Sequence, residues 1–121
     1  MKISYPVAGI VSVWVGNFPS EMDFDKCVDG PISDALNIEP PLASICEVSF
    51  QDEAVSIRKI IEGFSGWESF VEQAERAASI NGVGNVNAAL VCYYVQCEGA
   101  PDKWAKMNFL GSFDRTPRAN K

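Results

Sequence analysis

The chain has 121 residues, of which 47% are hydrophobic and 21% are charged, a balance typical of one folded domain that excludes a low-complexity chain. Sixteen acidic and ten basic residues give a formal net charge of −6, which disfavours binding to nucleic acid or to anionic membranes. No apolar run approaches the ~20 residues of a membrane-spanning helix, and no signal-peptide core follows Met1, so we expect a cytoplasmic protein. We expect residues 1–121 to form a single domain with flexible ends at 1–7 and 115–121.

Residues 11–18 have the pattern of a strand that ends in a turn. Side chains alternate with the two-residue period of a strand, in the order Val11, Ser12, Val13, Trp14, Val15, Gly16. Because apolar side chains occur on both faces, we expect this strand to lie in the centre of its sheet. The residues that follow Gly16 are suited to a turn and a helix start.

A short amphipathic helix is expected next, because Ser20 is a suitable N-cap with Asp23 as its capping-box partner. The buried stripe of this helix consists of three residues: Phe24, Cys27 and Val28. The sequence Asp29-Gly30-Pro31 predicts its end. Residues 32–42 allow one or two further helical turns before Pro40-Pro41 imposes an extended segment.

Residues 43–50 alternate well enough to predict a strand, after which Asp52 is the expected cap of a helix. The buried face of that helix has helical spacing: Ile57, Ile60, Ile61 and Phe64. Ser65 and Glu68 have capping-box spacing and predict another helix, which ends at Asn81-Gly82. Its apolar face comprises Trp67, Phe70, Val71, Ala74, Ala77 and Ala78.

Residues 86–97 form the longest strand candidate and are apolar on both faces, which predicts a second central strand. Residues 104–113 are expected to pair with it as a hairpin, with one face formed by Ala105, Met107, Phe109 and Phe113. The order of elements predicts an α+β fold, in which a single, mainly antiparallel sheet of about four strands packs with three or so helices.

The four cysteines are scattered in apolar surroundings: Cys27, Cys46, Cys92 and Cys97. We expect them to be small buried side chains and neither disulfides nor metal ligands. Cys92 and Cys97 are five residues apart on one predicted strand, so they are expected to point to opposite faces and not to share a metal. No metal site is therefore expected.

The sequence offers no catalytic residues and no cofactor site. It contains no histidine, the commonest general acid or base, and no Gly-x-Ser-x-Gly motif. Gly82 and Gly84 follow a predicted helix and enter a strand, the reverse of a phosphate-binding loop. The basic residues near Trp104 form too small a group for nucleic-acid binding.

Acidic residues are concentrated in one part of the chain. Between Ser20 and Glu53 there are nine acids and a single base, Lys26, whereas the sign reverses after Lys103. Such an acidic face attracts basic proteins, although it also serves simply as a solvated surface that keeps a protein soluble.

Three blocks of the sequence resemble the immunity protein 22 family of bacterial polymorphic-toxin systems. The first is Val11-Ser12-Val13-Trp14-Val15-Gly16-Asn17-Phe18, followed by an acidic helix. The other two are Asn87-Ala88-Ala89-Leu90-Val91-Cys92-Tyr93-Tyr94 and Phe109-Leu110-Gly111-Ser112-Phe113, which resemble the last two strands of the family. The first block is the most specific, and the likeness extends over most of the chain.

The resemblance implies an α+β immunity protein that binds and neutralises a cognate toxin and has no enzyme activity. Four residues match the family motif and are expected to be structural: Trp14, Gly16, Asn17 and Phe18. Because many toxin domains are basic nucleases, we expect acidic residues to face the toxin: Glu21, Asp23, Asp25, Asp29, Asp34 and Glu39. Two alternatives stay open, namely a regulatory binding module without a toxin partner and a small carboxylate-based enzyme. The oligomeric state is also left open.

Overall fold

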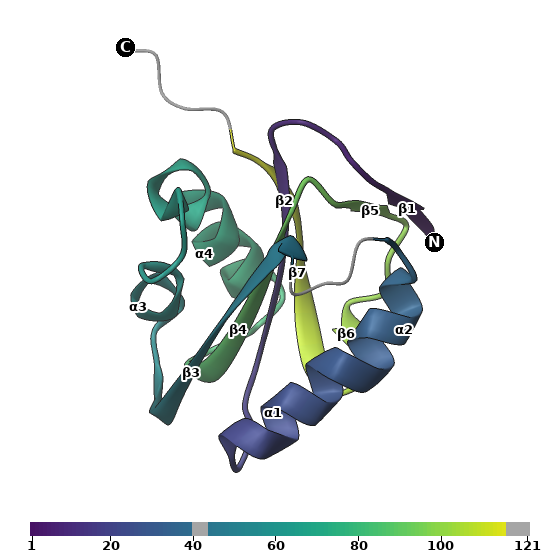
Figure 1. Ribbon diagram of the computed structural model, residues 1–121. Helices are drawn as coiled ribbons and strands as arrows, with labels where there is room; N and C mark the ends of the chain where they lie inside the picture. Colours follow the sequence, from purple (N-terminus) through teal and green to yellow (C-terminus); the bar gives the residue numbers. More distant parts are fainter. Residues whose placement is uncertain (40–43, 116–121) are drawn as a thin grey trace.

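The computed structural model describes residues 1–39 and 44–115, which form an α+β fold with strands in two antiparallel sheets. The larger sheet has five strands in the order β3-β4-β2-β7-β6, and the smaller one pairs β1 with β5 (Figure 1). The strands are β1 (Lys2–Ser4), β2 (Ile10–Gly16), β3 (Cys46–Val55), β4 (Val86–Tyr93), β5 (Gln96–Glu98), β6 (Lys103–Trp104) and β7 (Met107–Asp114). The α+β class is confirmed, whereas the expectation of a single sheet of about four strands is wrong.

Helical segments cover both faces of the larger sheet and give the molecule three layers (Figure 1). One face carries α3 (Ile57–Ile61) and α4 (Val71–Ile80). The other face carries α1 (Glu21–Cys27), the π-helical turn η1 (Val28–Ile32) and α2 (Ser33–Leu36). A separate apolar cluster fills the space on each side of the sheet, so both faces of the central strands are buried.

Strand β2 lies between β4 and β7, which confirms the prediction of a central strand. Its valines, Val11 among them, belong to the cluster beneath α3 and α4, and Trp14 belongs to the cluster beneath α1 and α2. Ser12 is fully buried and donates a hydrogen bond to the carbonyl oxygen of Val95 at 2.7 Å. This bond ties the larger sheet to the segment that enters β5 and the smaller sheet.

Residues 21–36 form one continuous helical segment, although the sequence predicted an end at Asp29-Gly30-Pro31. Pro31 has no N–H, and in a regular α-helix its ring would collide with the carbonyl oxygen of Cys27. The chain accommodates Pro31 by widening into the π-helical turn η1. The buried side chains nevertheless face the sheet as one stripe: Phe24, Cys27, Val28, Ile32 and Leu36. The Pro40-Pro41 prediction lies outside the described residues.

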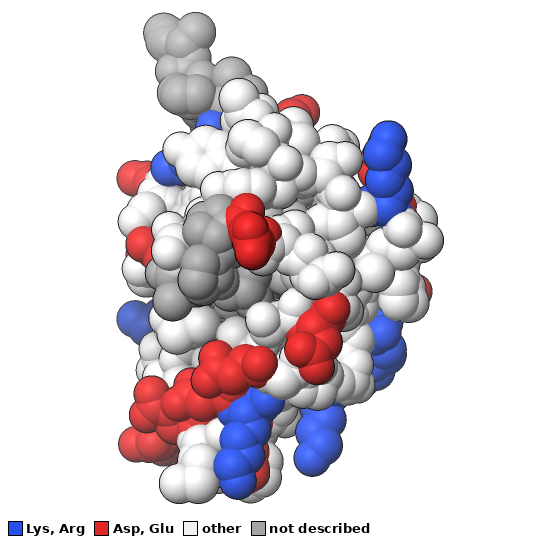
Figure 2. All heavy atoms as spheres, turned by 45° about the vertical axis from the view of Figure 1, so that its right-hand side comes forward, with Lys and Arg blue, Asp and Glu red and all other residues white. Residues whose placement is uncertain are grey.

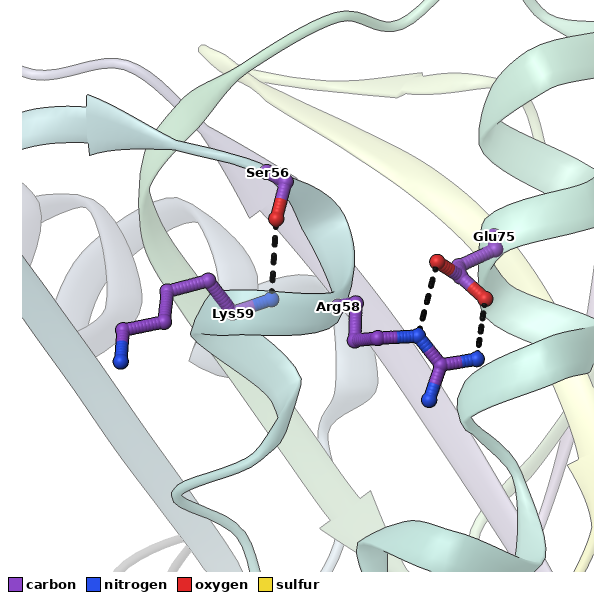
Figure 3. Close-up of polar contacts among 4 residues, drawn as sticks. All are labelled: Ser56, Arg58, Lys59 and Glu75. Atoms are coloured by element: carbon purple, nitrogen blue, oxygen red, sulfur yellow. Dashed lines mark hydrogen bonds and ion pairs between the residues drawn. The ribbon is translucent and has the colours of Figure 1, made fainter.

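Strand β3 extends to Val55, so Asp52 lies in the strand and does not cap the next helix as predicted. Ser56 is the N-cap of α3, and its hydroxyl accepts a hydrogen bond from the backbone N–H of Lys59 at 3.1 Å (Figure 3). Arg58 on α3 then pairs with Glu75 on α4 through two contacts of 2.7 and 3.2 Å (Figure 3). All four residues of the predicted stripe are buried, although Phe64 lies beyond the end of α3: Ile57, Ile60, Ile61 and Phe64.

Helix α4 begins at Val71, later than the predicted capping box of Ser65 and Glu68. A 3-10 turn, Trp67–Ser69, precedes it. Ser65 does not cap this helix, because its hydroxyl donates to Glu47 of β3 at 2.7 Å. The predicted end at Asn81-Gly82 is confirmed, since Asn81 is the C-cap and Gly82 has φ of 70°.

The predicted single strand over residues 86–97 is wrong, because Tyr94 adopts φ of 66° and breaks it. The chain leaves the larger sheet after β4 and resumes as β5, which pairs with β1. The break also overturns the prediction that Cys92 and Cys97 point to opposite faces, since both lie in the cluster beneath α1 and α2. Part of the expected flexible end at 1–7 therefore belongs to a sheet, whereas residues 116–121 lie outside the described residues.

Strand β7 pairs with β2 and not with β4, so the predicted hairpin between residues 86–97 and 104–113 does not form. Its hairpin partner is the short strand β6. A bulge at Leu110 shifts the register between β2 and β7 and reverses the faces beyond it. Met107 therefore packs with Trp14, whereas Phe113 packs against the opposite cluster, contrary to the prediction that they share a face.

Cys46 of β3 and Cys92 of β4 form a disulfide, which contradicts the prediction that no cysteine is bridged. The two residues are direct partners across the antiparallel strands, with Cα atoms 4.1 Å apart. They are 46 residues apart in sequence, and only the strand register brings them together. Cys27 and Cys97 are free and buried, as predicted.

Candidate functional site

The candidate site is the outer face of the helical segment α1–η1–α2 and the residues that follow it. Six acidic side chains are exposed there and define what we call the acidic helix surface: Glu21, Asp23, Asp25, Asp29, Asp34 and Glu39. Lys26 is the single basic residue in this segment. Acidic side chains run diagonally across this face in Figure 2, with basic side chains beside the lower end of the series. All six residues predicted to face a toxin are exposed in one stretch of the chain, residues 21–39.

The helix that presents these carboxylates is anchored from below. Phe24, Ile32 and Leu36 are at most 2% exposed and pack on the sheet beneath it. Phe24 also contacts the ring of Phe18, with centroids 5.4 Å apart. The acidic side chains therefore extend from a backbone whose position is fixed by the core, which limits the ordering cost of binding a partner.

An exposed apolar side chain lies within the acidic series. Met22 is 66% exposed, between Glu21 and Asp23 at the start of α1. A hollow of about 310 Å³ lies beside this helix and is lined in part by Asp23, Lys26 and Lys106. An apolar side chain inside a charged rim matches the general anatomy of protein–protein interfaces.

The six acids do not have equal roles. Asp23 takes part in the start of the helix, because the Ser20 hydroxyl donates to its carboxylate at 3.1 Å and accepts from its N–H at 3.2 Å. None of the six lies within ion-pair distance of a basic residue among the described parts of the chain. Apart from Asp23, the carboxylates of this surface are therefore available to meet an external cation.

Glu47, an acid of the same sequence stretch, has a different environment. It is half-buried, and its carboxylate accepts from the Ser65 N–H at 2.9 Å, from the Ser65 hydroxyl at 2.7 Å and from Tyr93 at 2.8 Å. The Tyr93 hydroxyl also lies 2.9 Å from the carbonyl oxygen of Ser65. Asp52 and Glu53 are exposed at the other end of β3. Among the nine acids of residues 21–53, the acidic helix surface therefore comprises only the six of residues 21–39.

The two titratable groups of this network have opposite pKa shifts. Burial alone would raise the pKa of Glu47, but the hydrogen bonds from Ser65 and Tyr93 and the charge of Arg115 together lower it. Burial raises the pKa of Tyr93, and the neighbouring Glu47 carboxylate raises it further. Glu47 therefore stays ionised and Tyr93 stays a neutral donor around neutral pH.

An open pocket of about 430 Å³ lies beside this network, and Cys46 and Arg115 are among its lining residues. The guanidinium carbon of Arg115 lies 4.9 Å from the centroid of the Tyr93 ring. No local sequence pattern indicates this arrangement. From the sequence, Arg115 belongs to the expected flexible end, and Ser65 has the spacing of a helix cap. The strand register and the bend at Gly66 bring these residues together.

The four motif residues lie where a structural role predicts. Trp14 and Phe18 are at most 4% exposed, and a Cβ on Gly16 would lie 3.2 Å from both the Lys106 carbonyl oxygen and the Phe18 ring. Asn17 is exposed, and its side chain donates to the Asn85 carbonyl oxygen at 3.1 Å. These contacts fix the turn between β2 and α1 and so set the position of the acidic helix.

Residues 1–39 and 44–115 contain no cluster of three or more His, Cys, Asp or Glu side chains suited to a metal ion. In the same residues, no helix has the length and apolar character that crossing a membrane would require. Comparisons with protein-family models, with curated proteins and with solved structures give no significant match to the chain.

Proposed function

We propose that this protein is a non-catalytic inhibitor of the immunity-protein type that binds a basic toxin domain through its acidic helix surface. The observation that carries the proposal is the exposure of six carboxylates and one base over residues 21–39, which comprise one helical segment and the residues that follow it. The sequence resemblance to the immunity protein 22 family supports the same conclusion.

The charge pattern suits rapid and selective capture of a basic protein. A surface of one sign raises association rates with an opposite charge by about 10- to 1,000-fold, and the effect weakens with salt. Met22 supplies apolar contact area inside this field, since it is 66% exposed. Charge therefore steers the encounter, and apolar contact around Met22 slows dissociation.

A nuclease domain is the toxin class that this surface fits best. Nucleases bind a phosphate backbone with clustered Lys and Arg side chains, and a row of carboxylates on a rigid helix offers those cations an alternative partner. The inhibitor would then occupy the groove that nucleic acid uses. Asp25 and Asp29 are four residues apart on adjacent turns and would contribute two of these contacts.

The experiment is co-expression with the toxin encoded beside this gene. Cells that express the toxin alone should stop growing, and the present chain should restore growth and co-purify with the toxin as a complex. If the chain co-purifies with the neighbouring gene product but that product does not stop growth, the result would favour the regulatory-module alternative. Failure to protect cells, although both proteins are expressed and soluble, would overturn the proposal.

A cytoplasmic location belongs to the same proposal. In a reducing cytoplasm the disulfide between Cys46 and Cys92 would be largely open, because structural disulfides persist mainly in oxidising compartments. Thiol labelling in intact cells distinguishes a cytoplasmic location from an oxidising compartment. In the cytoplasm most copies of the chain should carry these two cysteines in reduced form.

A further inference from the structure

The pocket beside Glu47 is distinct from the acidic helix surface, with which it shares no lining residue. Its volume of about 430 Å³ is within the range of pockets that hold small molecules. Its lining includes one guanidinium, from Arg115, and one carboxylate, from Glu47, together with apolar surface from Ile45 and Tyr94.

Arg115 is held in place by packing and not by an acceptor. Its Nε atom is buried and has no hydrogen-bond partner among the described residues. The guanidinium lies over the ring of Tyr93 on one side. Gly66 lies at the edge of the guanidinium formed by Nε and one terminal nitrogen, and a Cβ there would lie 2.8 Å and 2.6 Å from these two atoms. Gly66, with φ of 68°, therefore supplies the space that the guanidinium occupies.

Glu47 does not neutralise Arg115 by direct pairing. The two side chains form no ion pair within 4.0 Å among the described residues, and the carboxylate is committed to Ser65 and Tyr93. The donors of Arg115 thus border a pocket without an acceptor of their own. Since Nε is buried against Gly66, a ligand in the pocket would meet the terminal N–H donors of the guanidinium.

We propose that this pocket binds a small carboxylate that has a flat apolar body. A carboxylate matches the planar fork formed by the two terminal nitrogens of Arg115, whereas the nearby charge of Glu47 disfavours a doubly charged group such as phosphate. The apolar body packs between Ile45 and the ring of Tyr94, a residue of the pocket lining that is 45% exposed. The site does not depend on the proposed inhibitor function.

The test is an NMR titration of the whole chain with sodium benzoate, with neutral benzamide of the same shape and with inorganic phosphate. Benzoate should shift the Arg115 Nε–H signal and the Ser65 and Gly66 amide signals in a saturable way. Benzamide and phosphate should bind at least about tenfold more weakly, as expected for loss of a charged hydrogen-bond pair. Equal binding of benzoate and benzamide, or tighter binding of phosphate, would overturn the proposal.

Two variants locate the site. Arg115→Gln should weaken benzoate binding about tenfold or more, and Arg115→Lys, which keeps the charge but loses the fork, should give an intermediate affinity. Unchanged benzoate affinity in folded Arg115→Gln protein would contradict the assignment. The comparison of benzoate with benzamide uses the native chain, so the proposal stays testable even where a variant fails to fold.

Discussion

The side-chain amide of Asn87 pairs with both backbone polar groups of Phe18. Its Nδ2 donates to the Phe18 carbonyl oxygen at 2.8 Å, and its Oδ1 accepts from the Phe18 N–H at 2.9 Å. Both residues are buried, with exposures of 8% and 4%. The amide thus takes the place of a neighbouring strand just beyond the end of β2 and fixes the turn that leads into the acidic helix.

Asn87→Ala should lower the free energy of unfolding by about 2–3 kcal/mol, because it leaves two buried backbone groups without partners. Denaturant unfolding at neutral pH measures this loss. Asn17→Ala is the matched control, since its single hydrogen bond is exposed, and it should cost well under half as much. Equal losses in the two variants would show that the Asn87 bridge has no special role.

Gly16→Ala tests whether the motif is structural. The added Cβ would lie 3.2 Å from the Lys106 carbonyl oxygen and from the Phe18 ring, so we expect a loss of about 1–3 kcal/mol in stability. Gly84→Ala is the control, because a Cβ at that position would meet nothing within 4 Å and the φ of Gly84 is not positive. Partner affinity, measured on the folded fraction, should not change in either variant, and a selective loss of affinity in Gly16→Ala would indicate direct contact.

Glu47 should make stability depend on pH. Its pKa is lowered in the folded state, so its contribution is complete above the ordinary carboxyl pKa of about 4.3 and is lost as the pH falls through the lower folded-state value. Glu47→Gln should lower stability by about 1–2 kcal/mol at pH 7 and by much less at pH 3. Unfolding curves at both pH values check this, and a loss that is the same at pH 3 and pH 7 would contradict it.

The disulfide between Cys46 and Cys92 closes a long loop and should be a major source of stability. From the sequence separation of 46 residues, its reduction should cost about 2–4 kcal/mol. Denatured but unreduced protein should show two thiols, from Cys27 and Cys97, and reduced protein should show four. Four thiols before reduction would mean that the bond is absent from the isolated protein.

Local sequence patterns predicted several elements correctly because their causes are local. Alternation in residues 11–16 predicts β2, and helical spacing predicts the buried face of α3. The predictions that failed depended on non-local structure. The π turn at Pro31, the bulge at Leu110 and the break at Tyr94 each change which face a residue occupies, and none follows from its neighbours in sequence.

The candidate site likewise has one part that the sequence predicts and another that only the fold reveals. Exposure of Glu21, Asp23 and Asp25 follows from their positions away from the buried stripe of the predicted helix, so the sequence predicts it. The Glu47, Ser65, Tyr93 and Arg115 arrangement joins four separate segments, and only the fold reveals it. The role of Asn87 could not be predicted, because the residue lies in a strand that is otherwise apolar. Its hydrogen-bond partners are backbone atoms, which carry no sequence signal.

The acidic helix surface is proposed to bind a basic toxin domain. The test compares two triple variants with the same change in charge, both measured for affinity toward the proposed toxin partner, the protein encoded beside this gene. The first is Glu21→Lys with Asp25→Lys and Asp29→Lys, which spares Asp23 because that residue supports the helix start. The control is Glu62→Lys with Glu68→Lys and Glu72→Lys, all exposed and all in the part of the chain that covers the opposite face of the larger sheet with α3 and α4.

The decisive measurement is the dissociation constant of each variant as a function of salt concentration. The first triple should weaken binding by about 10- to 1,000-fold and should flatten the salt dependence, because the steering charges are lost. The control should bind like the native chain within a few-fold. Equal weakening in both triples, or native affinity and salt dependence in the first, would contradict the claim.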